Sequence, residues 1–378
     1  MSELVRLFAK LGLIAFGGPA AHIAMMEDEV VERRKWLSRQ HFLDLIGATN
    51  LVPGPNSTEM TMHVGYERAG WKGLFAAGVS FITPAALLTL AAAWAYVEFG
   101  TLPAVEPVLA GIRPVVVAVI LGALWRLGKK AVRTVWLGAV ALGVGVAVWF
   151  GVNPVAALFA GTILGGLMAL TVTQRLSVLA WPALVALQTA DVPLWRIGAF
   201  FLKVGAVLYG SGYVLIAFLE ADVVGRYGWL TQDQLLDAVA LGQLTPGPVL
   251  TTATFIGYLL AGVPGALVAT LGIFLPSFLF VWILNPLVPR LRESLWASAF
   301  LDAVNAAAVG LMAAVTLRLA VSSFFPDGVY PSGSPSWMAI GLFTAAAVAA
   351  IRFRVSTVWL VGLGAAVGYA VGYVASLF

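Results

Sequence analysis

The chain has 378 residues, of which 61% are hydrophobic and 11% are charged, with a net charge of +4. A soluble domain carries about 25% charged residues, so this composition excludes an ordinary soluble protein. Because the chain has no cysteine, it also excludes disulfides, thiolate catalysis and cysteine-ligated metal sites. The basic residues are spread over short loops, which gives no sign of nucleic-acid binding.

Apolar stretches long enough to cross a bilayer follow one another along the chain. A hydrocarbon core of about 30 Å needs roughly 20 apolar residues in helical form. The stretches are continuous rather than alternating, which predicts an all-α polytopic membrane protein and not a β-barrel. They cover residues 108–125, 136–150, 155–170, 266–284, 296–317 and 337–351.

The chain contains the same sequence twice. Residues 8–55 and 201–248 are related by an offset of 193, and 18 of these 48 positions are identical. Later matches, such as Arg126 with Arg318, keep an offset of 192. A duplicated hydrophobic chain with helix breaks at matching places is typical of a secondary transporter. We expect two homologous repeats of about six segments each, at residues 1–175 and 195–378, joined by a linker helix at 176–194.

Loop charge predicts the orientation of the two repeats, because short cytoplasmic loops carry an excess of Lys and Arg. The loop at residues 126–133 is strongly basic and is expected inside, whereas the matching loop at 322–336 has neither residue and is expected outside. The repeats are therefore predicted to be inverted, with the linker providing one extra crossing. The alternative is a linker at the membrane surface between parallel repeats. Loop charge does not separate full crossings from re-entrant hairpins for the first two segments of each repeat.

A Pro-Gly-Pro motif interrupts each repeat at the same position. Proline removes an amide donor and clashes with the preceding turn, so two prolines around a glycine are expected to break a helix. The free N–H groups of the helix that follows attract anions. Two such ends from inverted repeats would form an anion site, whereas the alternative is a kink that only serves helix packing. The predicted site residues are Pro53, Gly54, Pro55, Asn56, Ser57 and Thr58 in one repeat, and Pro246, Gly247, Pro248, Thr251 and Thr252 in the other, with the hydroxyl and amide side chains as added donors.

A glycine-rich segment precedes each Pro-Gly-Pro motif and predicts a second unwound stretch. Glycine lets backbones approach closely and adopt conformations that other residues avoid. The alternative is a simple small-residue contact between helices. The candidate residues are Gly17 and Gly18 in Phe16-Gly17-Gly18-Pro19, and Gly210, Ser211 and Gly212 in Tyr209-Gly210-Ser211-Gly212.

Charged residues inside apolar segments are the remaining candidates, because they are costly there and usually functional. Lys10 and Lys203 occupy equivalent positions, seven residues before Gly17 and Gly210, and are predicted to offer counter-charge to an anion. Snorkelling to the membrane surface is the alternative. Arg113 and Asn305 are further candidates for anion contact, and Glu59, His63, Asp302, Glu27 and Glu220 are candidates for proton transfer or gating. The alternatives are a structural pairing of Arg113 or Asp302 with a neighbour, and a structural role for Glu27 and Glu220.

Taken together, these motifs resemble the chromate transporter family, in its long form with two fused homologous halves. The resemblance covers nearly the whole chain, from about residue 7 to residue 378. It rests on Phe16-Gly17-Gly18-Pro19, Trp36-Leu37, Asn50-Leu51-Val52-Pro53-Gly54-Pro55, Gly65-Tyr66, Tyr209-Gly210-Ser211-Gly212-Tyr213, Gly228-Trp229-Leu230, Gly242-Gln243-Leu244-Thr245-Pro246-Gly247-Pro248, Ala253-Thr254-Phe255-Ile256-Gly257-Tyr258 and Phe300-Leu301-Asp302-Ala303-Val304-Asn305-Ala306.

The resemblance implies export of chromate across the inner membrane, which confers chromate resistance, with sulfate as a competitor or relative. Composition and spacing support an anion transporter but do not identify the anion. A channel and an intramembrane enzyme are the alternative classes, and the enzyme lacks a nucleophile–base pair. Three scattered histidines and the lack of a nucleotide-binding loop predict no metal and no cofactor. The expected partners are a chromate- or sulfate-like oxyanion and the lipid bilayer, with a homodimer as an option and no nucleic acid.

Overall fold

The computed structural model describes residues 1–16, 18–49, 52–100, 102, 104–170, 192–209, 211–285, 295–325 and 335–377, and these residues include no β-strand. Five of the helices are long and apolar enough to cross a membrane. The prediction of an all-α polytopic membrane protein is therefore confirmed. Gly17, Gly210, residues 176–191 of the predicted linker and most of the loop at 322–336 lie outside the described residues.

Both repeats contain the same order of helices. The first has α1 (Ser2–Ile14), α2 (Pro19–Glu27), the π-helix η1 (Asp28–Arg33), α3 (Arg39–Thr49), α4 (Asn56–Phe99), α5 (Glu106–Ala131), α6 (Val135–Trp149) and α7 (Pro154–Leu170). The second has α8 (Leu194–Val207), α9 (Val214–Phe218), the π-helix η2 (Leu219–Arg226), α10 (Gln232–Leu244), the short 3₁₀-helix η3 (Val249–Thr251), α11 (Thr252–Leu284), α13 (Leu295–Phe324), α14 (Trp337–Arg352) and α15 (Thr357–Ala375).

The long helices α4 and α11 are each folded back on themselves near their first third. The break falls at Gly70 in α4 and at Gly262 in α11, with φ values of +59° and +58° that favour glycine. A Cβ on Gly65 would lie 2.3 Å from the carbonyl oxygen of Gly73. Eight residues of straight helix would span about 12 Å, so the two limbs must run back along one another.

The segments that precede these breaks form two hairpins in the first repeat. The side chains of Glu3 and Arg34 are 2.6 Å apart, which joins the start of α1 to the residue that follows η1. His41 and Glu67 are 3.2 Å apart, which joins the start of α3 to the end of the first limb of α4. Both hairpins therefore have their ends together and their tips inside the protein. Re-entrant hairpins would have this geometry, and the choice between them and full crossings stays a prediction to test.

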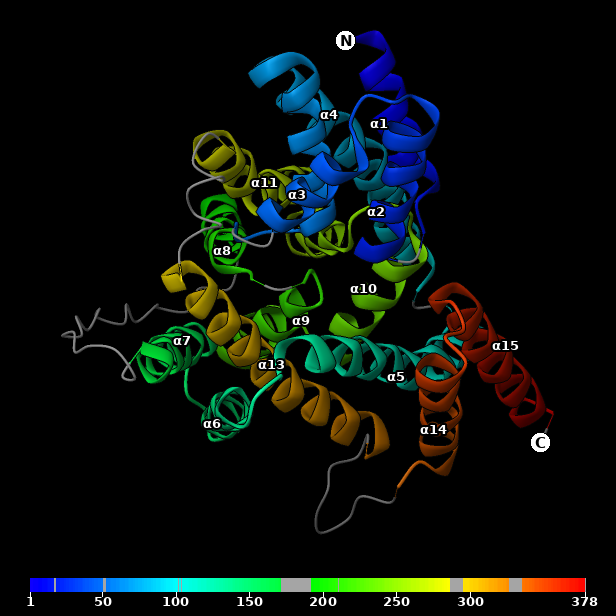
Figure 1. Cartoon of the computed structure of the whole chain (residues 1–378). Helices are drawn as coiled ribbons and strands as arrows, with labels where there is room; N and C mark the ends of the chain where they lie inside the picture. Colours follow the sequence, from blue (N-terminus) through cyan, green and yellow to red (C-terminus); the bar gives the residue numbers. More distant parts are fainter. Residues whose placement is uncertain are drawn as a thin grey trace.

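The remaining helices of each repeat pack against those of the other. α5 packs against α14 and α15, and its counterpart α13 packs against α6 and α7. Glycines permit these close approaches, since a Cβ on Gly111 would lie 2.3 Å from the carbonyl oxygen of Gly364. Figure 1 shows α5 and α13 running in opposite directions. Inverted repeats would have this arrangement, and the inversion itself stays a prediction.

Candidate functional site

The two Pro-Gly-Pro loops are buried and reach across to the opposite repeat. The N–H of Gly54 donates a hydrogen bond to the carbonyl oxygen of Leu208 at the end of α8, at 2.7 Å. The N–H of Gly247 donates to the carbonyl oxygen of Ala15 at the end of α1, at 2.9 Å. Ala15 and Leu208 are equivalent positions of the two repeats, so this exchange is reciprocal. The four interrupted tips therefore converge in the interior.

Glycine is required at the centre of each loop. Gly54 and Gly247 have φ values of +145° and +93°, which other residues rarely adopt. A Cβ on Gly54 would lie 2.3 Å from the Oγ of Ser277 in α11, and a Cβ on Gly247 would lie 2.4 Å from the Cβ of Ala85 in α4. Ser277 and Ala85 are also equivalent, so each loop sits against the long limb of the other repeat.

Helix N-termini point into this central region. α4 begins after Pro55, η3 begins after Pro248, and α2 begins after Gly18 with proline as its first residue. Their first N–H groups have no partner within the helix and carry the positive end of the helix dipole. The prediction that each Pro-Gly-Pro motif ends one helix and precedes another agrees with the structure. These ends supply donors for an anion at the convergence of the tips.

A cavity of about 90 Å³ opens beside the second loop. Gln243 carries a buried Nε2 that has no hydrogen-bond partner among the described residues. Its Oε1 accepts a hydrogen bond from the hydroxyl of Tyr213 at 3.2 Å. Gln243 lines the cavity, so an unused amide donor lies close to it, beside the helix ends. The lining residues of the cavity are Phe16, Gly18, Gly242, Gln243, Thr245, Gly247, Val249, Ser356, Thr357 and Val358.

The predicted hydroxyl donors are mostly engaged within the protein. Thr251 and Thr252 donate to the carbonyl oxygens of Pro248 and Val249, at 2.9 and 2.8 Å, a local bond that threonine often makes in a first turn. Ser57 lies 3.2 Å from a ring nitrogen of His22. Thr58 alone among the predicted hydroxyls of the two Pro-Gly-Pro motifs has a buried oxygen with no partner in the described part of the chain.

The remaining backbone candidates lie around the same tips. Pro53 and Pro246 are buried at the start of the two loops. Gly212 packs against the second loop, where a Cβ would lie 2.9 Å from a methyl group of Leu250. Ser211 accepts a weak bond from the N–H of Tyr213 at 3.4 Å and so helps to start α9.

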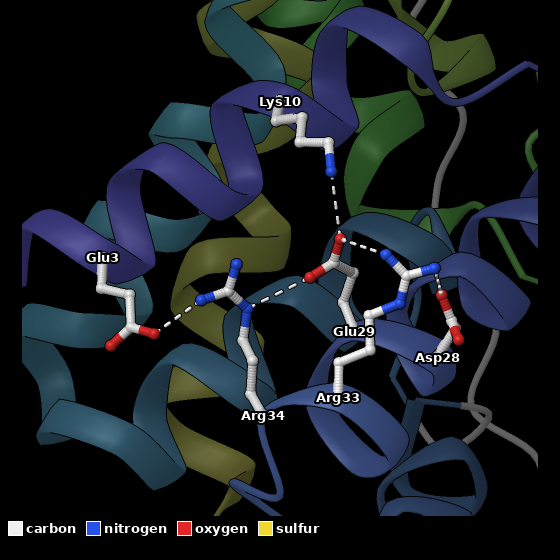
Figure 2. A network of polar contacts seen from close by, with 6 residues as sticks. All are labelled: Glu3, Lys10, Asp28, Glu29, Arg33 and Arg34. Carbon is white, nitrogen blue, oxygen red and sulfur yellow. Dashed lines mark hydrogen bonds and ion pairs between the residues drawn. The ribbon is translucent and has the colours of Figure 1, made fainter.

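Lys10 and Lys203 bind carboxylates of their own hairpins rather than line the cavity. Lys10 contacts Glu29 in η1 at 3.1 Å, and Lys203 forms an ion pair with Asp222 in η2. Glu29 and Asp222 are equivalent positions, so both repeats keep the same bond. Figure 2 shows Glu29 held between Lys10, Arg33 and Arg34. No acidic residue is near either lysine in sequence, which is why the sequence did not reveal these partners.

Arg113 also binds carboxylates, across the two repeats. Its guanidinium donates two hydrogen bonds of 3.0 Å to Asp237 in α10 and lies 3.0 Å from Asp233 and 3.1 Å from Glu106. Asp237 also accepts a bond from Tyr96 at 2.9 Å. The three positive charges that were predicted to face an anion are therefore already paired.

The predicted gating residues are divided between the two sides of the protein. Glu220 contacts Arg318 in α13 at 3.5 Å, whereas Glu27 contacts Arg39 at 3.4 Å. Asp302 and Asn305 are half-buried in α13. Neither side chain has a hydrogen bond or ion pair with another described residue.

Sequence reasoning did not single out three residues that the structure brings to the site: Gln243, Tyr213 and Arg126. Gln243 and Tyr213 lay in the motifs that carry the family resemblance, directly beside the predicted residues. Arg126 interacts electrostatically with Tyr213 and has no ion-pair partner among the described residues. It differs in this from its repeat counterpart Arg318, a contrast that only the structure provides.

Comparison with known proteins agrees with this architecture. The family model described as "Chromate transporter" matches residues 2–166 and 195–369. The chain is 35% identical over 349 residues to a chromate transport protein of Cupriavidus metallidurans, covering 85% of this chain and 83% of that protein. It is 35% identical over 340 residues to a chromate transport protein of Pseudomonas aeruginosa, covering 84% and 80%.

A third relative, a probable chromate transport protein of Synechococcus elongatus, is 31% identical over 341 residues and is covered over 84% of both chains. No solved structure matches the chain. The two matched regions coincide with the two sets of helices that meet at the Pro-Gly-Pro loops. This multi-pass membrane protein belongs to the chromate transporter family.

Proposed function

We propose that this protein is a secondary transporter that exports chromate, or a related tetrahedral oxyanion such as sulfate, across the inner membrane and so confers chromate resistance. The observation that carries the proposal is the cavity at the second Pro-Gly-Pro loop. Helix N-termini and the unpaired Nε2 of Gln243 meet there, inside the protein and between the two repeats. The names of the relatives supply chromate as the first substrate to test.

The site suits an oxyanion because it offers donors rather than a full ion pair. Backbone N–H groups and an amide bind the oxygens of a dianion without neutralising its charge permanently. Arg126 is the cation best placed to accompany the anion, since it acts on Tyr213, the residue that orients Gln243. Lys10, Lys203 and Arg113 stay candidates only for a state in which their present ion pairs open.

Alternating access follows from the division of the ion pairs. Arg113 and Asp237 join the two repeats on one side, and Arg318 pairs there with Glu220 within the second repeat. The equivalent residues on the other side are not paired with one another, and in this proposal the cavity opens toward that side. By the rule that basic loops are cytoplasmic, the open side is the inner one. Rocking of the repeats would break the ion pairs on the closed side and allow the open side to close.

The membrane potential provides a driving force for export. Moving one charge across 100 mV changes the free energy by about 2.3 kcal/mol. A dianion that leaves a negative-inside cell carries two charges, so the membrane potential favours its export by twice that amount per 100 mV. A carrier of this kind needs no nucleotide site.

Oxyanion uptake into inside-out vesicles tests the proposal. We expect saturable uptake of chromate and labelled sulfate, and faster uptake when unlabelled oxyanion is loaded inside the vesicles. A channel is the second candidate, and it would give flux that neither saturates nor responds to loaded oxyanion. A lack of any oxyanion flux by correctly inserted protein would contradict both.

A further inference from the structure

Four polar side chains with unsatisfied atoms lie around the first Pro-Gly-Pro loop, where they form a second polar site. Glu59 is fully buried, and neither of its carboxyl oxygens has a hydrogen-bond partner among the described residues. The same holds for Thr58 Oγ1, His63 Nε2 and Ser277 Oγ. Buried polar atoms without partners are rare in proteins, and several in one place indicate that something else binds there.

Gly54 makes room for this cluster. A Cβ on Gly54 would lie 2.2 Å from Oε1 of Glu59 and 2.3 Å from Oγ of Ser277. The Glu59 carboxyl, from α4, and the Ser277 hydroxyl, from α11, therefore face the same backbone position from the two repeats. The cluster sits where the loop of one repeat meets the long limb of the other, which is the interface that has to move during transport.

Among the residues that the structure describes, no cation faces Glu59. Besides Ser277 on α11, the side chains around it are His63 on its own helix and Tyr209 after α8, which interacts with it electrostatically. An ionised carboxylate at this depth would have no counter-charge among the described residues and only the hydroxyl of Ser277 as a nearby side-chain donor, so its burial would be very costly. The neutral acid costs far less, so the structure fits a Glu59 that holds a proton.

A line of titratable groups connects Glu59 to the end of its hairpin. Glu59, His63 and Glu67 are spaced four residues apart and so share one face of the first limb of α4. Glu67 contacts His41 at 3.2 Å, and both side chains are partly exposed. The line therefore runs from the protein interior to the basic, cytoplasmic end of the hairpin.

The hydrogen bonding of His63 leaves one of its ring nitrogens able to accept a proton. Its Nδ1 lies 2.7 Å from Oδ1 of Asn285, an oxygen that can only accept. In the neutral ring, Nδ1 then carries the hydrogen and the buried Nε2 is a free base. His63 can therefore accept a proton on the nitrogen that has no partner in the present state.

The second Pro-Gly-Pro loop has no buried acid, histidine or serine at the equivalent positions around it. At the offset of 193, Thr252 and Ile256 replace Glu59 and His63, and at the offset of 192 Thr251 and Phe255 replace them, so neither offset provides an acid or a base. Ala85 stands where Ser277 would be. One transporter therefore has a single such site, and it belongs to the repeat whose hairpins face the cytoplasm. A structural requirement for a buried carboxyl at this turn would apply to both repeats equally.

We propose that Glu59 is a proton-binding site, in exchange with the cytoplasm through His63 and Glu67, and that oxyanion transport is coupled to the movement of its proton. The inference rests on the proposed function, because it concerns the coupling of that transport. It adds a second ligand, a proton, at the loop opposite the anion cavity.

The test uses full-length protein in liposomes whose membrane potential is clamped with potassium and valinomycin. Labelled sulfate uptake is measured with and without a pH gradient, while pyranine inside the liposomes reports proton movement. Wild type should respond to the gradient and move protons together with sulfate. Glu59→Gln should lose both responses and still exchange labelled for unlabelled sulfate at equal pH. Glu98→Gln, an exposed acid on the same helix, is the matched control and should behave as wild type.

His63→Phe is the second variant, because it installs the residue that the second repeat carries at the offset of 192 and is suited to the fold. It should slow proton movement and leave equal-pH exchange intact. A Glu59→Gln protein that still responds to the pH gradient would overturn the inference, and so would sulfate transport by wild type without proton movement. Both outcomes leave the proposed function standing, whereas wild type without any oxyanion exchange would remove the proposed function itself.

Discussion

The two sides of this transporter use equivalent residues in different ways. On one side Arg318 reaches Glu220 at 3.5 Å and also donates to the carbonyl oxygens of Val148 and Trp149 at 2.6 and 2.9 Å. On the other side its counterpart Arg126 is exposed, without an ion-pair partner in the described chain, and Glu27 binds Arg39 instead. The contact is therefore made between α13 and η2 of the second repeat, and the equivalent contact between α5 and α2 of the first repeat is not made.

A second pair of positions shows the same contrast. Arg113 pairs with Asp237, and α10, which carries Asp237, packs against α5 and α15. The equivalents are Asn305 and Asp44, which cannot form an ion pair with one another. α5 and α13 run in opposite directions (Figure 1). From their positions along these helices, Arg113 and Arg318 belong to one side, and Arg126 and Asn305 to the other. Under the proposed carrier mechanism, this difference between the repeats corresponds to a state that is closed outside and open inside.

The largest expected effect comes from breaking the closed side. Arg113→Met leaves Asp237, whose side chain is fully buried, without its cation. Loss of one partner of a buried ion pair costs about 3–5 kcal/mol, so we expect a strongly lowered melting temperature and loss of oxyanion transport. Asn305→Ala is the matched change on the open side and should alter both quantities little. Equal damage from the two variants would remove the contrast between the sides.

The lysine pairs of the two repeats should also differ in strength. Asp222 is almost fully buried and pairs with Lys203, whereas Glu29 keeps Arg33 and Arg34 when Lys10 is lost. Lys203→Met should therefore destabilise the protein by about 3 kcal/mol, and Lys10→Met by about 1 kcal/mol or less. Thermal unfolding of the purified variants measures this order. The double variant Lys203→Met with Asp222→Asn should recover most of the loss, and failure to recover would contradict the ion pair.

Gln243 tests whether the cavity binds the anion through an amide donor. Gln243→Glu keeps the shape and the acceptor for Tyr213 but replaces the unpaired donor with an oxygen. Losing one charge-assisted hydrogen bond and adding a like charge should weaken oxyanion binding by at least about tenfold. Calorimetry with chromate, sulfate, molybdate and phosphate measures the affinity and identifies the preferred anion. Unchanged affinity would place the anion elsewhere.

A charge exchange on the open side gives the smallest and most specific effect. If the inner side closes as the outer side does, Glu27 and Arg126 pair in the alternate state. Glu27→Arg and Arg126→Glu should each slow transport a few-fold, since exposed ion pairs are worth about 1 kcal/mol or less. The double variant should recover the rate. Recovery by Arg39→Glu instead would mean that only the present contact of Glu27 with Arg39 matters.

The sequence predicted those features that depend on neighbouring residues. Two prolines around Gly54 or Gly247 break a helix in any surroundings, so the positions of the tips could be read directly. The repeat offset predicted equivalent roles for Lys10 and Lys203. The lysine partners could not be predicted, because Glu29 and Asp222 lie 19 residues further on and meet the lysines only when the hairpin folds back.

The site also depends on contacts between the repeats, which no local pattern encodes. Gly54 bonds to Leu208 and faces Ser277, both from the other half of the chain. The hydroxyls of Thr251 and Thr252 were expected to serve an anion, but the first turn of the helix uses them for its own carbonyl groups. Gln243 became a candidate only because its Nε2 has no partner in the folded chain that the structure describes.

The most direct measurement of the central claim uses the absence of cysteine from the chain. Ser356→Cys places a thiol of nearly the same size at the rim of the cavity, and Ser38→Cys places one at an exposed loop as a control. A membrane-impermeant thiol reagent should label Cys at position 356 from the cytoplasmic side, and sulfate should slow this labelling but not that of the control. Labelling from the outside only, or labelling that sulfate leaves unchanged, would contradict an oxyanion site that opens inward between the repeats.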